Sequence, residues 1–353
     1  MTHRVTLILG DGIGPEVISA ACRAVEATGA DMAWERRDLG MSAPSPLPRE
    51  TLDSIRENGV ALKGPVATPI ESGLRSLNVA LRQALDLYAG VRPCRLMVGV
   101  PSVYETVDFL VVRENTEGMY TGIEFEMGEP ATKELIRFIG ETTGRWIRED
   151  SGISIKSISE EGSERVVRFA FDWAARNGRA KVTASHKANI MKDSDGLFLE
   201  VARRIAAEEH PDVAFEDRII DALCMALIQR PEAFDVIVLP NLYGDIVSAV
   251  GAGLIGGLGV APGGHFGERM AVFEATHGTA MRHAGRDTAN PTGAMLSAAM
   301  MLRHLGDTAA GDRLEAAVTT TIAAGEVTAD IAVPGAKALG TSAFTDAVVG
   351  RLA

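Results

Sequence analysis

The sequence predicts an α/β fold from three observations. Residues 5–9 form an apolar run that reads as a buried strand, and a turn and a helix start follow it at once. Residues 109–112 and 236–239 also read as strands, and each leads into a polar loop, where open α/β sheets place their chemistry. Stretches with helical periodicity alternate with these strands: 163–176, 198–209 and 290–305.

The first turn, residues 10–14, is rich in glycine and opens a helix. Pro15 stands at the first helical position and Glu16 in the first turn, both of which favour a helix N-terminus. The glycine spacing is not the GxGxxG of a dinucleotide site, and no acidic residue clearly closes a strand about 20 residues further on. We therefore interpret the segment as a turn that lets the helix approach its strand closely.

The stretch 75–82 reads Arg-Ser-Leu-Asn-Val-Ala-Leu-Arg, and a second basic group follows at 92–95. Guanidinium groups beside small neutral donors suit a compact polycarboxylate, because arginine binds carboxylates with two parallel hydrogen bonds. Asn78 and Arg82 share one face of a helix that Ser76 could cap. The apolar face of that helix consists of Leu77, Leu81 and Leu85. The alternative is a solvated basic face.

Composition narrows the class of protein. The chain has 353 residues, enough for two domains, and a formal net charge of −12, which argues against nucleic acid or an anionic membrane as the main partner. Its three cysteines, Cys22, Cys94 and Cys224, are too few and scattered for a disulfide framework. Residues 5–9 are too short for a signal peptide, and the glycine-rich run 246–266 reads as buried helix and turn. We expect a cytoplasmic protein.

Four more motifs extend this pattern: 113–120 (Arg-Glu-Asn-Thr-Glu-Gly-Met-Tyr), 186–192 (His-Lys-Ala-Asn-Ile-Met-Lys), 241–245 (Asn-Leu-Tyr-Gly-Asp) and 274–280 (Glu-Ala-Thr-His-Gly-Thr-Ala). Together with the arginine stretch, they closely resemble the isocitrate and isopropylmalate dehydrogenase family. These are metal-dependent decarboxylating dehydrogenases of 2-hydroxy acids. The resemblance runs nearly from end to end.

The resemblance implies a two-domain α/β fold without a Rossmann nucleotide site. The large domain would be discontinuous, formed by residues 1–97 and 252–353, and the small domain would comprise residues 98–251. It also implies a homodimer whose small domains interlock. Each active site would then take Lys187 and Asp221 from the neighbouring subunit.

Within the family, a serine and an asparagine upstream of the arginine mark the isocitrate branch, and Ser76 and Asn78 match this pair. If the substrate carried an isopropyl group against these two side chains, the buried hydroxyl and amide would be left unpaired, at about 1–3 kcal/mol each. The residues that resemble the family's carboxylate clamp are Arg82, Arg92 and Arg113.

The remaining chemistry also follows from the resemblance. Asp221 and Asp245 would bind Mg²⁺ or Mn²⁺, which prefer hard oxygen ligands. Lys187, acting with Asp245, would remove the hydroxyl proton as hydride passes to the nicotinamide. After decarboxylation of the resulting β-keto acid, Tyr120 would help to deliver the proton that completes the product.

Ala249 departs from the family, which usually has a second aspartate four residues after the one that matches Asp245. This departure keeps three functions in view. The first is an isocitrate dehydrogenase, and the second is the same reaction on an analogue, either homoisocitrate or a phosphonate-bearing acid. The third is a regulatory subunit without catalysis, which retention of Tyr120, Lys187 and both metal aspartates disfavours.

The resemblance places the cofactor site at Thr68, Glu274, His277, Gly278, Arg282, His283 and Asn290. NAD enzymes of the family carry an aspartate at the position of Arg282, where it binds the ribose hydroxyls. Positive charge at Arg282 and His283 favours NADP over NAD. The segment 328–330, Thr-Ala-Asp, looks more like the NAD type.

Overall fold

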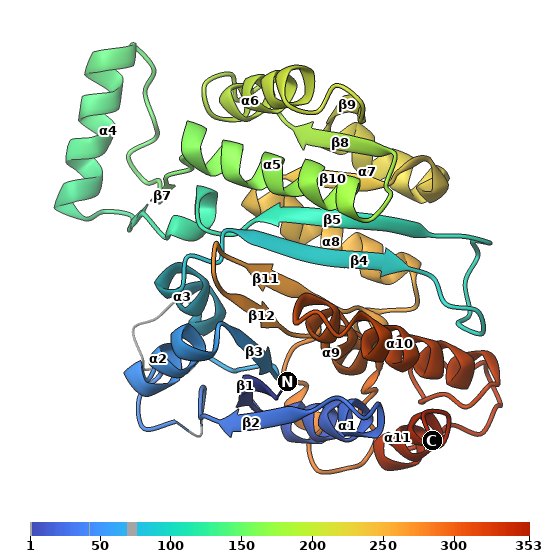
Figure 1. Ribbon diagram of the computed structural model, residues 1–353. Coiled ribbons are helices and arrows are strands. Elements are labelled where there is room, and N and C mark those ends of the chain that lie inside the picture. Colours follow the sequence, from blue (N-terminus) through green and yellow to red (C-terminus); the bar gives the residue numbers. More distant parts are fainter. Residues whose placement is uncertain (1, 42, 69–75) are drawn as a thin grey trace.

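The computed structural model describes residues 2–41, 43–68 and 76–353. A ten-stranded sheet forms its centre, with helices on both faces (Figure 1). In order across the sheet, the strands are β2 (Met32–Arg36), β1 (His3–Ile8), β3 (Val60–Lys63), β12 (Ala271–Phe273), β11 (Gly264–Phe266), β4 (Ala89–Arg95), β5 (Asp108–Glu114), β10 (Val236–Leu239), β8 (Lys181–His186) and β9 (Ala214–Ile219). The predicted α/β fold is confirmed.

The middle of this sheet is antiparallel. β11 and β4 pair antiparallel with each other and with β12 and β5, whereas the strands outside them are parallel to their neighbours. His265 of β11 lies opposite Gly90 of β4, which lies opposite Arg113 of β5. Side chains in such a row project from the same face, so His265 and Arg113 share a face, and the Asn115 amide fills the space over Gly90 between them.

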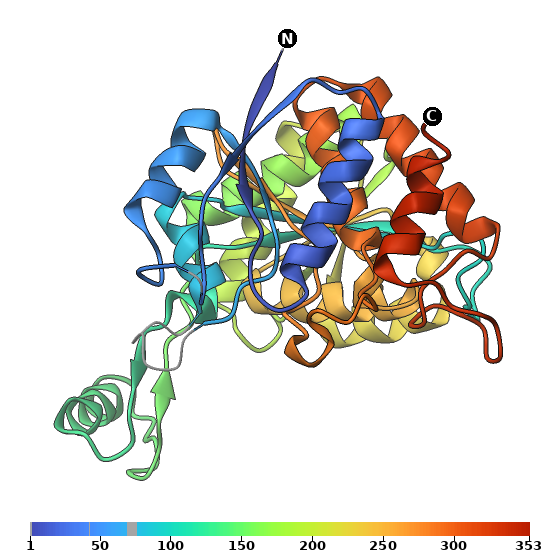
Figure 2. The same ribbon diagram turned by 90° about the horizontal axis from the view of Figure 1, so that it is seen from below.

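Helices cover both faces. α5 and α6 lie on one side of β5, β10 and β8, and α7 and α8 on the other (Figures 1 and 2). The helices are α1 (Gly14–Ala27), α2 (Arg49–Asn58), α3 (Leu77–Ala84), α4 (Pro130–Thr143), α5 (Glu160–Arg176), α6 (Ser194–Glu208), α7 (Ile220–Gln229), α8 (Asn241–Leu254), α9 (Thr292–His304), α10 (Thr308–Ala323) and α11 (Thr341–Val349). Within the described residues, no helix is both long and apolar enough to cross a bilayer.

The first turn forms as the sequence predicts. β1 ends at Ile8, and α1 begins at Gly14 with a proline in its first turn. Gly12 has a φ of +60°, which favours glycine, and a Cβ on Gly14 would stand 2.3 Å from the carbonyl oxygen of Leu9. The glycines therefore serve close packing of helix on strand.

α3 also begins and packs as expected. The Ser76 hydroxyl caps it by accepting a hydrogen bond from the Val79 N–H at 3.4 Å. The three leucines of its apolar face, Leu77, Leu81 and Leu85, are buried. Arg75, the first residue of the predicted basic stretch, lies outside the described residues.

The division into two domains stays a prediction. The sheet runs without a break across the proposed boundary, because β4 pairs with β5, and position 252 falls inside α8. One hydrophobic core extends from Val5 to Val348. The part that stands clear of this body is an arm formed by α4 and by β6 (Glu124–Phe125) and β7 (Ile153–Ser154) (Figure 2).

Candidate active site

A cleft of about 320 Å³ collects most of the predicted substrate residues. It lies beside the antiparallel middle of the sheet, between α3, α8 and the loop that follows β12. Its lining residues include Asn78, Arg82, Arg92, Arg113, Asp245, Ala249, Glu274, His277 and Gly278. Ser76 caps α3 beside it, and Thr68 accepts a hydrogen bond from the Leu77 N–H at 2.8 Å.

Arg113 is held firmly at the carboxyl end of β5. Its Nε and Nη2 donate to the Asn241 side-chain oxygen at 3.1 and 2.7 Å, and its Nη1 pairs with Asp245. Gly244 makes this possible, because a Cβ there would lie 2.5 Å from Cγ of Arg113. Asn241, Gly244 and Asp245 all lie on the first turns of α8, so one helix end both seats this arginine and supplies its counter-charge.

Arg82 reaches the same cleft from α3. Its Nε donates to the Asn78 carbonyl oxygen at 3.1 Å, and its Nη1 donates to the Asn115 side-chain oxygen at 3.3 Å. Burial, with a smaller contribution from Arg113, lowers the pKa of Arg82 to about 10. Arg82 is therefore still a cation at neutral pH.

Arg92 is the least satisfied of the three arginines. It is 8% exposed, and its Nη1 is buried without a hydrogen-bond partner among the described residues. Its Nη2 lies 3.1 Å from Nε2 of His265. Gly263 lets the guanidinium in, since a Cβ there would stand 1.7 Å from Nη1. A buried cation with an unused donor fits an anionic ligand.

Tyr120 and Asp245 form a hydrogen-bonded phenol–carboxylate pair at the edge of the cleft. The Tyr120 hydroxyl donates to Oδ2 of Asp245 at 2.7 Å, and the Arg113 guanidinium lies over the phenol ring at 4.8 Å from its centre. Burial, together with the hydrogen bond to Asp245, raises the pKa of Tyr120. The phenol therefore keeps its proton at neutral pH.

Lys187 and Asp221 form a separate pair, and neither residue is among the lining residues of the cleft. The Lys187 ammonium pairs with Asp221, whose pKa it lowers, and the Lys187 N–H donates to the buried Asp195 carboxylate at 2.7 Å. The Asp221 side chain is 67% exposed. Within one chain, the predicted catalytic and metal residues therefore form two groups: Tyr120 with Asp245 at the cleft, and Lys187 with Asp221 outside its lining.

Apart from Thr68, which precedes α3, the predicted cofactor residues lie along the segment between β12 and α9. The His277 Nδ1 is 3.1 Å from the Gly278 carbonyl oxygen, while its Nε2 is buried without a partner among the described residues. Each polar atom of the Asn290 amide has a partner. Its Oδ1 accepts a hydrogen bond from the Thr292 N–H at 3.0 Å, and its Nδ2 donates one to Asp330 at 3.0 Å. Arg282 and His283 are exposed in a short 3₁₀ turn, away from the cleft lining.

Sequence reasoning missed four residues that organise the cleft: Lys63, Asn115, Asn241 and His265. Lys63 is 1% exposed and pairs with Glu274, while its Nζ also donates to the Asn78 side-chain oxygen at 3.1 Å. The sequence could have indicated Asn115, because it lies two residues after Arg113 at the end of a predicted strand, and residues two apart on a strand share a face. No local pattern indicated Lys63 or His265.

The chain thus carries, beside the middle of its α/β sheet, a cleft lined by three arginines with a phenol–carboxylate pair at its edge. The family model for isocitrate/isopropylmalate dehydrogenase matches residues 4–348. The chain belongs to the isocitrate/isopropylmalate dehydrogenase family, and it is accordingly an enzyme of the decarboxylating dehydrogenase class.

Individual relatives agree. A crystal structure of isocitrate dehydrogenase from Methylococcus capsulatus is 45% identical, with a TM-score of 0.90 over 99% of each chain. A Drosophila melanogaster protein named probable isocitrate dehydrogenase (NAD) subunit alpha, mitochondrial, is 43% identical over 99% of this chain and 88% of its own. A Dictyostelium discoideum protein, named as a regulatory subunit of mitochondrial isocitrate dehydrogenase (NAD), is 45% identical over 98% of this chain and 89% of its own.

These names correct one prediction. The expectation of a cytoplasmic protein is contradicted, because the curated relatives are named as mitochondrial proteins. The preference for NADP gains no support from them either, since their names specify NAD. Arg282 and His283, on which that preference depended, are exposed and are not among the lining residues of the cleft.

Proposed function

We propose that this protein catalyses the oxidative decarboxylation of isocitrate to 2-oxoglutarate, with NAD as cofactor, as a homodimer with shared active sites. The observation that supports this most is the buried, unpartnered Nη1 of Arg92 beside Arg82 and Arg113. Three guanidinium groups around one cleft suit a substrate with several carboxylates. An apolar group on the substrate would leave Arg92 buried and unpaired.

Ser76 and Asn78 would hold the distal acidic group. The Asn78 side-chain oxygen already accepts a hydrogen bond from Lys63, so its NH₂ group is the part available to a ligand. The Ser76 oxygen accepts from the Val79 N–H, which leaves its hydroxyl hydrogen available to a ligand. Both groups therefore present donors, as a carboxylate requires.

The proton transfers would be carried out by Asp245, Lys187 and Tyr120. Lys187 of the second subunit, acting with Asp245, would take the hydroxyl proton while hydride passes to NAD from the carbon that bears this hydroxyl. Tyr120 keeps its proton at neutral pH and is linked to Asp245 at 2.7 Å. It would deliver a proton to the carbon that loses CO₂.

The donor set fits a divalent cation only when two chains combine. Within the described residues of one chain, no three His, Cys, Asp or Glu side chains cluster as a metal site requires. Asp245 lines the cleft with half its side chain exposed, and Asp221 of a second chain would supply further oxygen ligands. Mg²⁺ or Mn²⁺ would supply Lewis-acid stabilisation of developing negative charge.

Exposed apolar side chains support the homodimer. Met225 and Ile228 on α7 and Ile246 on α8 are all at least half exposed, and they follow Asp221 and Asp245 within two turns. A second copy that covered this surface would bring Lys187 and Asp221 toward its partner's cleft.

NAD is favoured over NADP by the names of the relatives and by one fixed charge. The Asp330 carboxylate accepts from Asn290, an expected adenine contact, at 3.0 Å and from Thr328 at 2.6 Å. A held anion there disfavours an additional phosphate. If Arg282 nevertheless assists NADP, Arg282→Asp should lower the kcat/KM for NADP about fivefold relative to that for NAD.

The test of the proposed function uses the purified full-length chain alone. NADH formation from isocitrate with Mn²⁺ or Mg²⁺, abolished by a chelator and exceeding NADPH formation, would support it. A folded, metal-loaded dimer without turnover would contradict it. Homoisocitrate, a phosphonate analogue and a partner subunit would then be tried in that order.

A further inference from the structure

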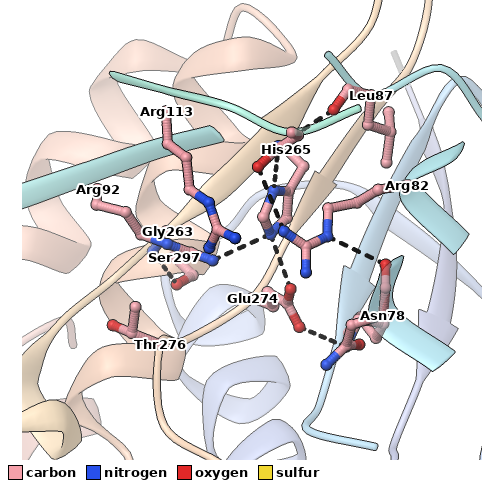
Figure 3. Close-up of polar contacts among 12 residues, drawn as sticks. Asn78, Arg82, Leu87, Arg92, Arg113, Gly263, His265, Glu274, Thr276 and Ser297 are labelled. Carbon is pink, nitrogen blue, oxygen red and sulfur yellow. Dashed lines mark hydrogen bonds and ion pairs between the residues drawn. The ribbon is translucent and has the colours of Figure 1, made fainter. Parts of the chain in front are cut away.

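Beneath the substrate arginines, a buried chain of hydrogen bonds is centred on His265. Asn115 links it to Arg82 on one side, and Glu274 links it to Lys63 on the other. Figure 3 shows Arg82 and Arg92 approaching the His265 ring from opposite sides, with Glu274 below. His265 is 1% exposed. Its location follows from the row His265–Gly90–Arg113 in the sheet, where the missing side chain of Gly90 leaves room for the Asn115 amide.

The contacts of Asn115 fix the orientation of its amide. Its Nδ2 donates to the Leu87 carbonyl oxygen at 3.1 Å, and its Oδ1 accepts from Arg82 at 3.3 Å. Its Nδ2 therefore also faces Nδ1 of His265, at 2.9 Å. An N–H donor at this distance requires a lone pair on Nδ1, so Nδ1 carries no proton.

The opposite side of the ring supports the same tautomer. Nε2 of His265 lies 2.8 Å from Oε1 of Glu274, and a carboxylate oxygen at this distance needs a donor. Although burial opposes its charge, Lys63 and then the His265 hydrogen bond hold the pKa of Glu274 well below its ordinary value, so it is an acceptor. Burial, with Arg92 next, lowers the pKa of His265 to about 3, which agrees with a neutral ring.

The Nε2–H tautomer has a consequence for Arg92. Its Nη2 faces Nε2 at 3.1 Å, so two donors meet and no hydrogen bond forms there. Nη1 has no partner either within the described residues. Because a buried guanidinium without acceptors is costly, this arrangement favours any anion that enters the cleft.

We propose that His265 is a positioning residue of the substrate cleft: as a neutral imidazole protonated on Nε2, it links Asn115 and Arg82 to Glu274 and denies Arg92 an acceptor. Arg92 is thereby left to bind a substrate carboxylate. The role in substrate binding rests on the proposed function, whereas the tautomer does not.

The first test is ¹⁵N NMR of the full-length protein labelled at histidine nitrogens, with the His265 signals assigned by their loss in His265→Gln. We expect a protonated Nε2 and an unprotonated Nδ1 at pH 7, unchanged at pH 5. The opposite tautomer, or an imidazolium at pH 7, overturns the proposal. This result is independent of catalysis, so it separates failure of the inference from failure of the proposed function.

The second test is kinetic. A glutamine amide at position 265 can offer Arg92 an oxygen, which an incoming carboxylate must displace. His265→Gln should therefore raise KM for isocitrate about tenfold, the worth of roughly one hydrogen bond, while kcat and KM for NAD stay within about threefold.

The matched control is His304→Gln. His304 packs against Phe266, the next residue of β11, whose side chain alternates to the other face of the sheet, with ring centres 5.7 Å apart. His304→Gln should leave all kinetic constants unchanged. A lower melting temperature for His265→Gln with unchanged KM would show a merely structural role and refute the positioning role.

Discussion

Two groups of predicted site residues in this chain differ in how completely the fold fixes their side chains. Around the cleft, Arg82, Arg92 and Arg113 are buried, and their neighbours set their directions before any ligand arrives. Lys187 and Asp221 are partly or largely exposed, away from the cleft lining, and pair with each other. The fold thus sets the directions of the cleft arginines before any ligand arrives, whereas the Lys187–Asp221 pair lies outside the cleft lining of the same chain.

The interactions of the two groups also differ in strength, and those of the buried cleft group are the stronger. Burial of the cleft charges makes their interactions strong and their unmet hydrogen bonds costly. The exposed Lys187–Asp221 pair is screened by water and contributes little to stability, so it can be exchanged for a contact across an interface at little cost. Exposure at this pair is thus compatible with function.

The largest expected effect tests whether Lys187 acts in a neighbour's site. Lys187→Met should lower kcat about 1,000-fold and leave isocitrate binding, measured by calorimetry, nearly intact. Asp245→Asn should be similarly inactive. After both variants are unfolded and refolded together in equal amounts, about a quarter of wild-type activity should return, because half of the dimers are mixed and each carries one intact site. Activity that never returns would place both residues in one chain's site.

A smaller effect is expected from Gly263→Ala in the preorganised region. The new Cβ would overlap Nη1 of Arg92 and displace the guanidinium. We expect kcat/KM for isocitrate to fall about 100-fold, mainly through KM, in steady-state assays. Gly253→Ala is the control, because a Cβ at that helical position meets nothing within 4 Å. Equal behaviour of the two variants would count against a fixed Arg92.

The smallest expected effect is a change with pH in the free energy of unfolding, caused by His265 in the buried region below the cleft. The pKa of His265 is about 3 when folded against an ordinary 6.5, so the unfolded chain binds this proton first on acidification. The contribution of this pKa difference to the free energy of unfolding is complete above pH 6.5. It is lost as pH falls toward 3, by up to about 1.4 kcal/mol per pH unit. Urea unfolding at pH 7 and pH 5 should show a steeper loss in wild type than in His265→Gln. Parallel losses would argue against a neutral, buried His265.

Much of the fold and part of the site could be predicted from local sequence. The Ser76 cap, the buried leucine face of α3 and the glycine turn before α1 depend on neighbours within a few residues, and they form as predicted. The three arginines were predicted by resemblance, and the structure does gather them in one cleft. Lys187 and Asp221 were predicted to act in the site of a neighbouring subunit. Within one chain they pair with each other outside the cleft lining, and their role in a neighbour's site stays a prediction.

By itself, the sequence determined the class of fold, the turn before α1, the cap of α3 and the family, because periodicity, caps and motif residues act over short distances. Only the tertiary structure decided that His265 meets Arg92, which is 173 residues away. This contact depends on the antiparallel pairing of β11 with β4, and strand order is set by packing of the whole sheet. The hydrogen bonds that fix the His265 tautomer arise only once that pairing exists.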